Sequence, residues 1–403
     1  MAQTSRAYHD HPQSAERPRR EPGAGATGWV RSCMPAVRES LAAVWLPWVI
    51  ARVVTLLALA LAKFEVRTLR ITEPKAVQSA HQGLLTADAA WYRLIAMHGY
   101  GTPRTSLRFF PLMPLVTRGV TDVTHLPTGA ALLVVSNVCA LGATMLVYGL
   151  ARHELRDVAS ARRAAWIFSL VPPAFVLVMG YSESLFILLA AAAFLCLRRR
   201  LWAWSALWGF LAGACRPIGF LLAIPAVIEG ARGWRGPDRR SKGTRAVAVL
   251  APIAGCLAYL AWAGAVFGDF FAPFRLQHQG EPPSVSADPL VNLYRDARDA
   301  LTGAHLGSGL HLPWILLGLT LSAVALARLP SSFGVYSLGV VLVASVTAIN
   351  FESFERYALS AFPLWIAAST LTKSPRVMVT VVAVSSVGLF AYALLAFLGA
   401  YVP

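Results

Sequence analysis

Long apolar segments alternate with short polar ones over most of the chain. A helix of about 20 apolar residues crosses the hydrocarbon core of a bilayer. About eleven segments follow this pattern, several of them shorter than 20 residues: 41–63, 129–151, 164–179, 183–197, 201–215, 217–229, 246–267, 312–329, 333–350, 358–371 and 377–399. The pattern predicts an all-α, polytopic membrane protein with about eleven transmembrane helices.

Two apolar regions, 164–197 and 201–229, are interrupted and are predicted to be helical hairpins. The first contains Gly-Tyr-Ser-Glu-Ser at 180–184, and the second contains Cys-Arg-Pro at 215–217. An interruption at membrane depth is tolerated only where protein covers it or where it lines a wet cavity. We therefore expect both interruptions to be covered or to border such a cavity.

The polar segments divide the chain into a tail and one membrane domain. Residues 1–40 are rich in Pro, Gly and Arg and are predicted to be a disordered, basic cytoplasmic tail. Residues 41–403 are predicted to be a single transmembrane domain. Within it, the first outer loop (64–128) and the second outer loop (268–311) are long enough to be functional, and amphipathic helices are expected in them.

The composition agrees with a membrane protein and gives no sign of a metal site. Hydrophobic residues make up 56% of the chain and charged residues 14%, whereas soluble domains carry about 25% charged residues. The five cysteines are scattered without a CxxC pair, so neither a disulfide framework nor a zinc site is indicated. His98, His305 and His311 also lack metal-ligand spacing. We expect no metal or other cofactor.

A net charge of +16 raises the question of a nucleic-acid partner. With the N-terminus in the cytoplasm, however, the cytoplasmic segments hold 22 of the 36 Lys and Arg residues and the outer segments hold 12. Positive charge marks the cytoplasmic side of membrane proteins. The basic excess therefore predicts topology and contact with anionic membrane lipid, and no nucleic acid is needed to explain it.

The stretch 86–100 in the first outer loop combines an acid, aromatic residues and a histidine. Residues 88–98 are predicted to form a short helix that places Asp88, Trp91 and Tyr92 on one face. A carboxylate in the first turn of a helix is favoured by the helix dipole and suits a general base. The alternative is a helix cap on an amphipathic helix lying in the membrane interface.

Arg108 and Phe110 follow in the run Arg-Phe-Phe-Pro-Leu-Met-Pro. The prolines and aromatic residues favour an interfacial helix or a re-entrant turn. The residues then either belong to a site or form an aromatic belt with a snorkelling Arg108.

Three further charged residues lie in or beside apolar spans. Glu183 stands in the interruption after Tyr181, where an intramembrane acid usually faces a cavity or a partner, or else is a charge at a helix start. Arg216 suits a phosphate, because a guanidinium matches its oxygens, or serves as a counter-ion for Glu183. Arg356, followed by Tyr357, is a second phosphate-binding candidate or part of a solvated outer loop.

Acids beside arginines in an outward-facing cavity suit transfer from a phosphate-activated donor to a hydroxyl. The base takes the hydroxyl proton, and the cations stabilise the departing phosphate. A donor held at the membrane would be a lipid phosphate.

Several motifs, in order along the chain, resemble the PIG-V type of mannosyltransferase, which includes the second mannosyltransferase of GPI-anchor synthesis and many bacterial relatives. The matching segments are 88–100, 109–115, 137–138, 181–186, 216–219, 356–357 and 362–364. The chain differs from the usual family pattern at Ala87, where Trp is common, and at Met113, where Tyr is common.

The resemblance implies a GT-C fold, a polyprenyl- or dolichyl-phosphate-mannose donor and inversion at the anomeric carbon. It also implies an integral multi-pass protein, in a bacterium in the plasma membrane, with its active site on the outer face. The implied roles are a catalytic base, Asp88; a donor phosphate and sugar site of Glu183, Arg216, Arg356, Tyr357 and Tyr181; and a positioning aromatic wall of Trp91, Tyr92, Arg108 and Phe110.

The hydroxyl acceptor is left open as a glycolipid, a protein or a cell-wall polymer. Two other classes of function also remain. Broken helices and intramembrane charges suit a transporter or lipid flippase, and an inactive GT-C-like scaffold would keep the fold without transfer.

Overall fold

The computed structural model describes residues 26–101, 103–232, 239–276, 288–302, 306–347 and 353–401, and these ranges contain helices and no strand. The chain divides into two compact units, Met1–Glu39 and Ser40–Pro403. Helix α1 begins at Ala26 and ends at Thr68, so it starts inside the segment 1–40 that was expected to be a disordered tail. Extending a long helix costs less than nucleating a new one.

Four described helices are long and apolar enough to cross a membrane: Val37–Thr68 of α1, α5 (Thr128–Leu155), Lys242–Phe267 of α10 (Arg239–Phe267) and α17 (Pro375–Phe397). The other predicted spans correspond to further helices, several of them shorter: α6 (Val158–Leu170), α7 (Glu183–Arg198), α8 (Trp202–Cys215), α9 (Ala223–Ala231), α13 (Leu306–Arg328), α14 (Ser331–Thr347), α15 (Phe354–Ser360) and α16 (Pro363–Ser369). The prediction of an all-α, polytopic membrane protein is confirmed.

Three predicted spans are broken rather than continuous. The span 164–179 consists of α6 and the 3₁₀ helix η3 (Pro172–Leu177), and the span 217–229 consists of η4 (Pro217–Leu222) and α9. The span 358–371 is divided between α15 and α16. The segments η3, η4 and α16 each begin with a proline, which lacks the N–H that a continuous helix would use.

The interruption after η3 is covered by polar side chains from α1 and α5. The carbonyls of residues 177–179 accept hydrogen bonds from Arg52 Nη2 at 3.2 Å, Asn137 Nδ2 at 3.1 Å and Ser136 Oγ at 2.6 Å. Arg52 Nε also donates to Asn137 Oδ1 at 3.0 Å. The backbone groups freed by the break are therefore satisfied by protein, as the sequence predicts for a break at membrane depth.

Glycines allow α8 and α10 to cross at very close range. A Cβ added at Gly213 would lie 2.1 Å from the carbonyl oxygen of Pro252, and one added at Gly255 would lie 2.0 Å from that of Phe210. Both distances are far below van der Waals contact. The two backbones could not approach this closely with any other residue at these positions.

Gly213→Ala and Gly255→Ala are each expected to lower the thermal unfolding temperature of the detergent-solubilised protein. The added methyl group has to push the helices apart, and overpacking of this kind costs about 1–3 kcal/mol or more. The matched control is Gly149→Ala in α5, because nothing lies within 4 Å of a Cβ there. Equal unfolding temperatures for all three variants would contradict the close crossing.

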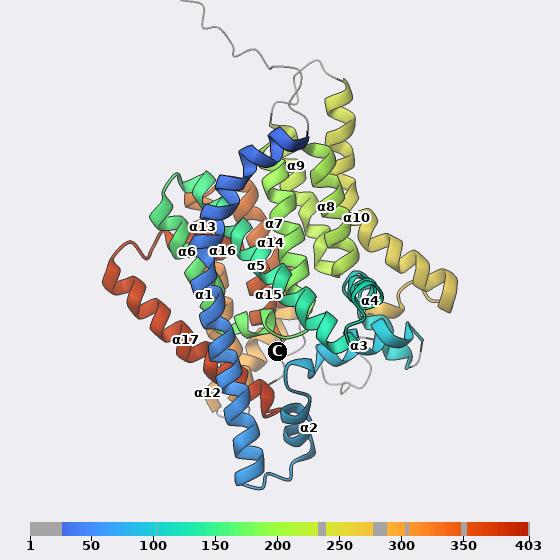
Figure 1. Ribbon diagram of the computed structural model, residues 1–403, viewed down its shortest axis with the longest axis vertical. Coiled ribbons are helices and arrows are strands. Elements are labelled where there is room, and N and C mark those ends of the chain that lie inside the picture. The colour runs from blue at the N-terminus through green and yellow to red at the C-terminus, as the bar shows by residue number, and fades with distance from the viewer. Residues whose placement is uncertain are drawn as a thin grey trace, which may run out of the picture. The chain divides into compact units, whose positions relative to one another are not determined.

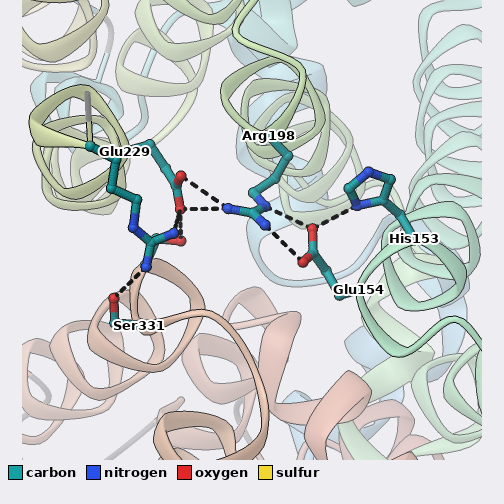
Figure 2. Close-up of polar contacts among 7 residues, drawn as sticks. His153, Glu154, Arg198, Glu229 and Ser331 are labelled. Carbon is teal, nitrogen blue, oxygen red and sulfur yellow. Dashed lines mark hydrogen bonds and ion pairs between the residues drawn. The ribbon is translucent and has the colours of Figure 1, made fainter. Parts of the chain in front are cut away.

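A buried ion network joins four helices at the end of α7 that lies away from Glu183. Figure 2 shows Arg198 between the carboxylates of Glu154 from α5 and Glu229 from α9. Arg198 Nε lies 2.8 Å from Glu154, and its Nη1 lies 3.0 Å from Glu229. Ser332 at the start of α14 also donates to Glu229. Since a helix of 16 residues is about 24 Å long, this network is remote from Glu183.

The first outer loop folds into helices, as predicted. It contains α2 (Pro74–Gln82), α3 (Asp88–His98), η2 (Arg104–Arg108) and α4 (Leu112–Thr124), and the second outer loop contains α11 (Ala272–Arg275) and α12 (Pro289–Thr302). Figure 1 shows α3 beside α4 and α2 near the end of α1. The helix expected at 88–98 has the predicted bounds, and its first residue, Asp88, pairs with Arg356 of α15.

Candidate active site

Each of the two acids begins a helix. Asp88 is the first residue of α3 and Glu183 is the first residue of α7. The N-terminal end of a helix carries partial positive charge and stabilises a carboxylate placed there. Neither acid is the capping residue, because Ala87 and Ser182 occupy the N-cap positions and make no side-chain capping bond. The interpretation of Asp88 as a helix cap is therefore wrong.

Ala87 has an unusual backbone conformation directly before Asp88. Its φ is 53° and its ψ is −126°, a conformation that residues with a side chain rarely adopt. Such strain persists only where surrounding structure holds it, and it is common at functional sites.

The two arginines reach the acids from other helices. Arg216 follows the last residue of α8, where the negative end of the helix dipole favours a cation. Arg356 lies in the first turn of α15. Although these residues are far apart in sequence, the ends of α7, α8 and α15 bring them to one place beside α3.

The four charged side chains form one alternating chain, from Asp88 through Arg356 and Glu183 to Arg216. Arg356 Nη1 pairs with Asp88 Oδ2, and Arg356 Nε lies 3.0 Å from Glu183 Oε1. Arg216 Nη1 pairs with the same Glu183 oxygen. The interpretation of Arg216 as a counter-ion for Glu183 is confirmed, and that of Arg356 as part of a solvated loop is wrong.

Asp88 is the most exposed member of this charged chain. The Asp88 side chain is 28% exposed, whereas that of Arg356 is 10% and that of Glu183 is 0% exposed. The Arg216 side chain is 7% exposed. Solvent therefore reaches the Asp88 carboxylate more readily than the other three side chains.

Two tyrosines predicted for the site flank the arginines. The guanidinium of Arg356 lies 5.5 Å from the Tyr181 ring centroid, and that of Arg216 lies 5.2 Å from the Tyr357 ring centroid. Cation–π contacts of this length stabilise a desolvated arginine. The rings thus help to hold both guanidinium groups in place.

Tyr92 and Ser182 connect α3 to the start of α7. Tyr92 Oη donates a hydrogen bond to Ser182 Oγ at 2.7 Å, and Arg216 Nη1 lies 3.4 Å from the same oxygen. Burial raises the pKa of the Tyr92 phenol well above its ordinary value, so it remains a donor. Ser182 was not among the site residues predicted from the sequence. Its position directly before the buried acid Glu183 could have indicated that it contacts Tyr92 and Arg216.

The aromatic wall consists of Trp91, Tyr92 and Phe109. Phe109 stacks on Trp91 with ring centroids 5.6 Å apart and meets Tyr92 edge-on at 5.3 Å. Arg108 lies at its edge, 6.0 Å from the Phe109 ring centroid. This group borders the charged chain through Tyr92.

Phe110, which was predicted for this wall, lies elsewhere. Its ring packs against Tyr259 of α10 at 4.8 Å, in a separate cluster. Phe109 has extended backbone angles, and successive side chains of an extended segment point to opposite sides. Which of the two neighbouring phenylalanines faces Tyr92 therefore depends on the position of α10, against which the other one packs.

Three polar residues beside apolar spans lie outside the described residues: Gln277, His278 and Glu352. Among the residues that the structure describes, no three His, Cys, Asp or Glu side chains are grouped as metal ligands. The expectation that no metal is required stays a prediction.

Residues 48–226 match the family model described as Mannosyltransferase (PIG-V). This range includes Asp88, Glu183 and Arg216, whereas Arg356 lies beyond it. No match was found among curated proteins. The family model thus agrees, over the first part of the membrane domain, with the resemblance seen in the motifs.

Among solved structures, the chain is similar to the apo form of the oligosaccharyltransferase from Archaeoglobus fulgidus. The TM-score is 0.42 and the sequence identity is 14%, over 86% of this chain and 56% of that one. The chain thus spans little more than half the length of that protein. A likeness at this level carries no conclusion about activity.

Proposed function

We propose, starting from the match of residues 48–226 to the mannosyltransferase model, that this chain is a membrane glycosyltransferase of the GT-C type. It transfers mannose, with inversion, from a polyprenyl- or dolichyl-phosphate donor to a hydroxyl acceptor. The observation that carries the proposal is the chain of Asp88, Arg356, Glu183 and Arg216, in which the most exposed member is a carboxylate.

Asp88 is the general base of the proposed reaction. Its carboxylate takes the proton of the acceptor hydroxyl as that oxygen attacks the anomeric carbon of the sugar. The bond between the anomeric carbon and the phosphate oxygen breaks in the same displacement, so the configuration inverts. Its place in the first turn of α3 and its partial exposure support this role.

Arg356 receives the phosphate in this proposal. A phosphodiester donor carries one negative charge, and the departing phosphate gains a second, which a guanidinium stabilises. Arg356 is the arginine that already pairs with Asp88, so an arriving phosphate competes with Asp88 for it. Donor binding then frees the Asp88 carboxylate to act on the acceptor.

Glu183 and Arg216 hold Arg356 in position. Glu183 contacts Arg356 through Nε, which leaves the Nη groups directed toward Asp88. Arg216 lies on the far side of Glu183. We assign these two residues to the rear of the donor site, with Tyr181 and Tyr357 against the guanidinium groups.

The distribution of basic residues supports an active site on the outer face, with the N-terminus in the cytoplasm. Lipid-linked sugars would reach the site from within the membrane. The acceptor is a hydroxyl of a glycolipid, a protein or a cell-wall polymer, and no cofactor takes part in the proposed step.

The test uses the purified full-length protein in liposomes with radiolabelled polyprenyl-phosphate-mannose and a panel of hydroxyl acceptors. We expect label to move to an acceptor and polyprenyl phosphate to be released, with no transfer from GDP-mannose. Movement of intact donor between leaflets would instead identify a flippase. Donor binding without turnover would identify an inactive scaffold, and either result would overturn the proposal.

A further inference from the structure

Glu355 is a fully buried acid that the proposed reaction does not use. It precedes Arg356 in the first turn of α15, and it is 0% exposed. Burying a carboxylate is costly unless hydrogen bonds compensate for the lost water. Tyr401, close to the C-terminus and 8% exposed, donates a hydrogen bond from its Oη to Glu355 Oε2 at 2.9 Å.

Tyr401 is itself held firmly by its surroundings. Its backbone N–H donates to the carbonyl of Leu395 at 3.2 Å, which folds the residue back on the end of α17. Its ring meets that of Tyr392 edge-on at 5.2 Å, and Tyr392 Oη accepts a hydrogen bond from Trp314 Nε1 of α13 at 2.9 Å. These contacts fix the position of the Tyr401 ring and, with it, the position of the hydroxyl that bonds to Glu355.

The same C-terminal segment also contacts the first outer loop. A Cβ at Gly399 would lie only 3.0 Å from the side chain of Lys75 in α2. Figure 1 shows the end of α17 reaching the region of α15 and α2. The segment 398–401 therefore touches both the helix that carries Arg356 and the loop that carries Asp88.

Helix α15 needs such support because it is short. It has seven residues and follows Ser353, whose φ of 64° is left-handed. A helix of two turns is not stable on its own. The position of its first turn, and with it the position of the Arg356 backbone, depends on tertiary contacts.

We propose that Tyr401 is a positioning residue, which holds the first turn of α15 through Glu355 and thereby keeps Arg356 opposite Asp88. The structural part of this inference stands on the contacts of Tyr401, and its catalytic consequence rests on the proposed function.

The first experiment compares Tyr401→Phe with wild type in the liposome transfer assay. Phe keeps the ring and removes only the hydroxyl bonded to Glu355, and a lost hydrogen bond to a charged group corresponds to about a tenfold effect or more. We expect kcat to fall by about tenfold with a smaller change in donor KM. The matched control is Tyr259→Phe in α10, which also loses a buried hydroxyl, bonded to the carbonyl of Leu107 at 2.9 Å and outside the support of Tyr401. An unchanged kcat in Tyr401→Phe would overturn the inference.

The second experiment does not depend on activity. Unfolding temperatures are measured for Tyr401→Phe, Asp88→Asn and the double variant, and the same set is repeated with Tyr259→Phe. If Tyr401 supports the contact between Arg356 and Asp88, its loss costs less once Asp88 is neutral. The two shifts are then non-additive, whereas Tyr259→Phe and Asp88→Asn add.

Additive shifts for Tyr401 and Asp88 would overturn the inference. If Tyr401→Phe does not fold, Glu355→Met replaces it in the cycle, because methionine has a similar size and removes the acceptor of the same hydrogen bond together with the buried carboxylate. A wild type without transfer activity would defeat the proposed function alone, since the thermal cycle still decides the role of Tyr401.

Discussion

Asp88→Asn is expected to abolish transfer while the protein stays folded. The amide has nearly the shape of the carboxylate but cannot accept the acceptor proton at a useful rate. General base catalysis contributes about 10²–10⁴-fold, so we expect the rate of transfer from labelled polyprenyl-phosphate-mannose to fall by about 10³-fold. The single-turnover rate is the appropriate measurement, because it separates chemistry from product release.

The control for this variant is Asp122→Asn. Asp122 is an exposed acid on α4 of the same outer loop, and its substitution is expected to leave the rate unchanged. A rate for Asp88→Asn within tenfold of wild type would remove Asp88 from the mechanism.

Donor binding separates the two roles assigned to Asp88 and Arg356. Because Asp88 competes with the donor phosphate for Arg356 in the proposed site, Asp88→Asn is expected to bind donor at least as tightly as wild type. Weaker binding would mean that Asp88 contacts the sugar or that Arg356 does not receive the phosphate.

Glu183→Gln is expected to be the most destabilising single substitution at the site. The carboxylate is fully buried between two arginines, and its loss takes the paired carboxylate from Arg216 and leaves Arg356 with Asp88 alone. Breaking a buried ion pair in this way costs about 3–5 kcal/mol. The measurement is thermal or denaturant unfolding of the protein in detergent micelles.

Two further variants make this result specific. Glu73→Gln, at an exposed position before α2, is expected to unfold like wild type. Glu183→Gln combined with Arg216→Met is expected to be more stable than Glu183→Gln alone, because the double variant also removes the cation that has lost its carboxylate. A single Glu183→Gln variant as stable as wild type would contradict the charged chain described here.

Much of the fold could be predicted from local sequence alone. The length and apolarity of 128–155 or 375–397 are set by the thickness of a bilayer, which every spanning helix has to match. The helix at 88–98 was predictable for a similar reason, because its spacing of polar and aromatic residues repeats with the helical period. The apolar spans and this helix depend only on residues that are close together in the sequence, within a few helical turns.

The candidate site was predictable as a set of residues but not as a network. Asp88, Glu183, Arg216 and Arg356 each stood out as charged residues in or beside apolar spans. That Arg356 joins Asp88, 268 positions earlier, to Glu183 was not visible. Arg52 shows the same limit, since it lay within a predicted span but its role in covering the interruption after η3 depends on α5.

By itself, then, the sequence determined the class of protein, the positions of most spans and the charged residues that matter, because these follow from local composition and periodicity. Only the tertiary structure decided which acid pairs with which arginine, that Phe109 rather than Phe110 faces Tyr92, and that Tyr401 reaches Glu355. Those contacts join segments far apart in the chain, and they depend on how the helices pack against one another.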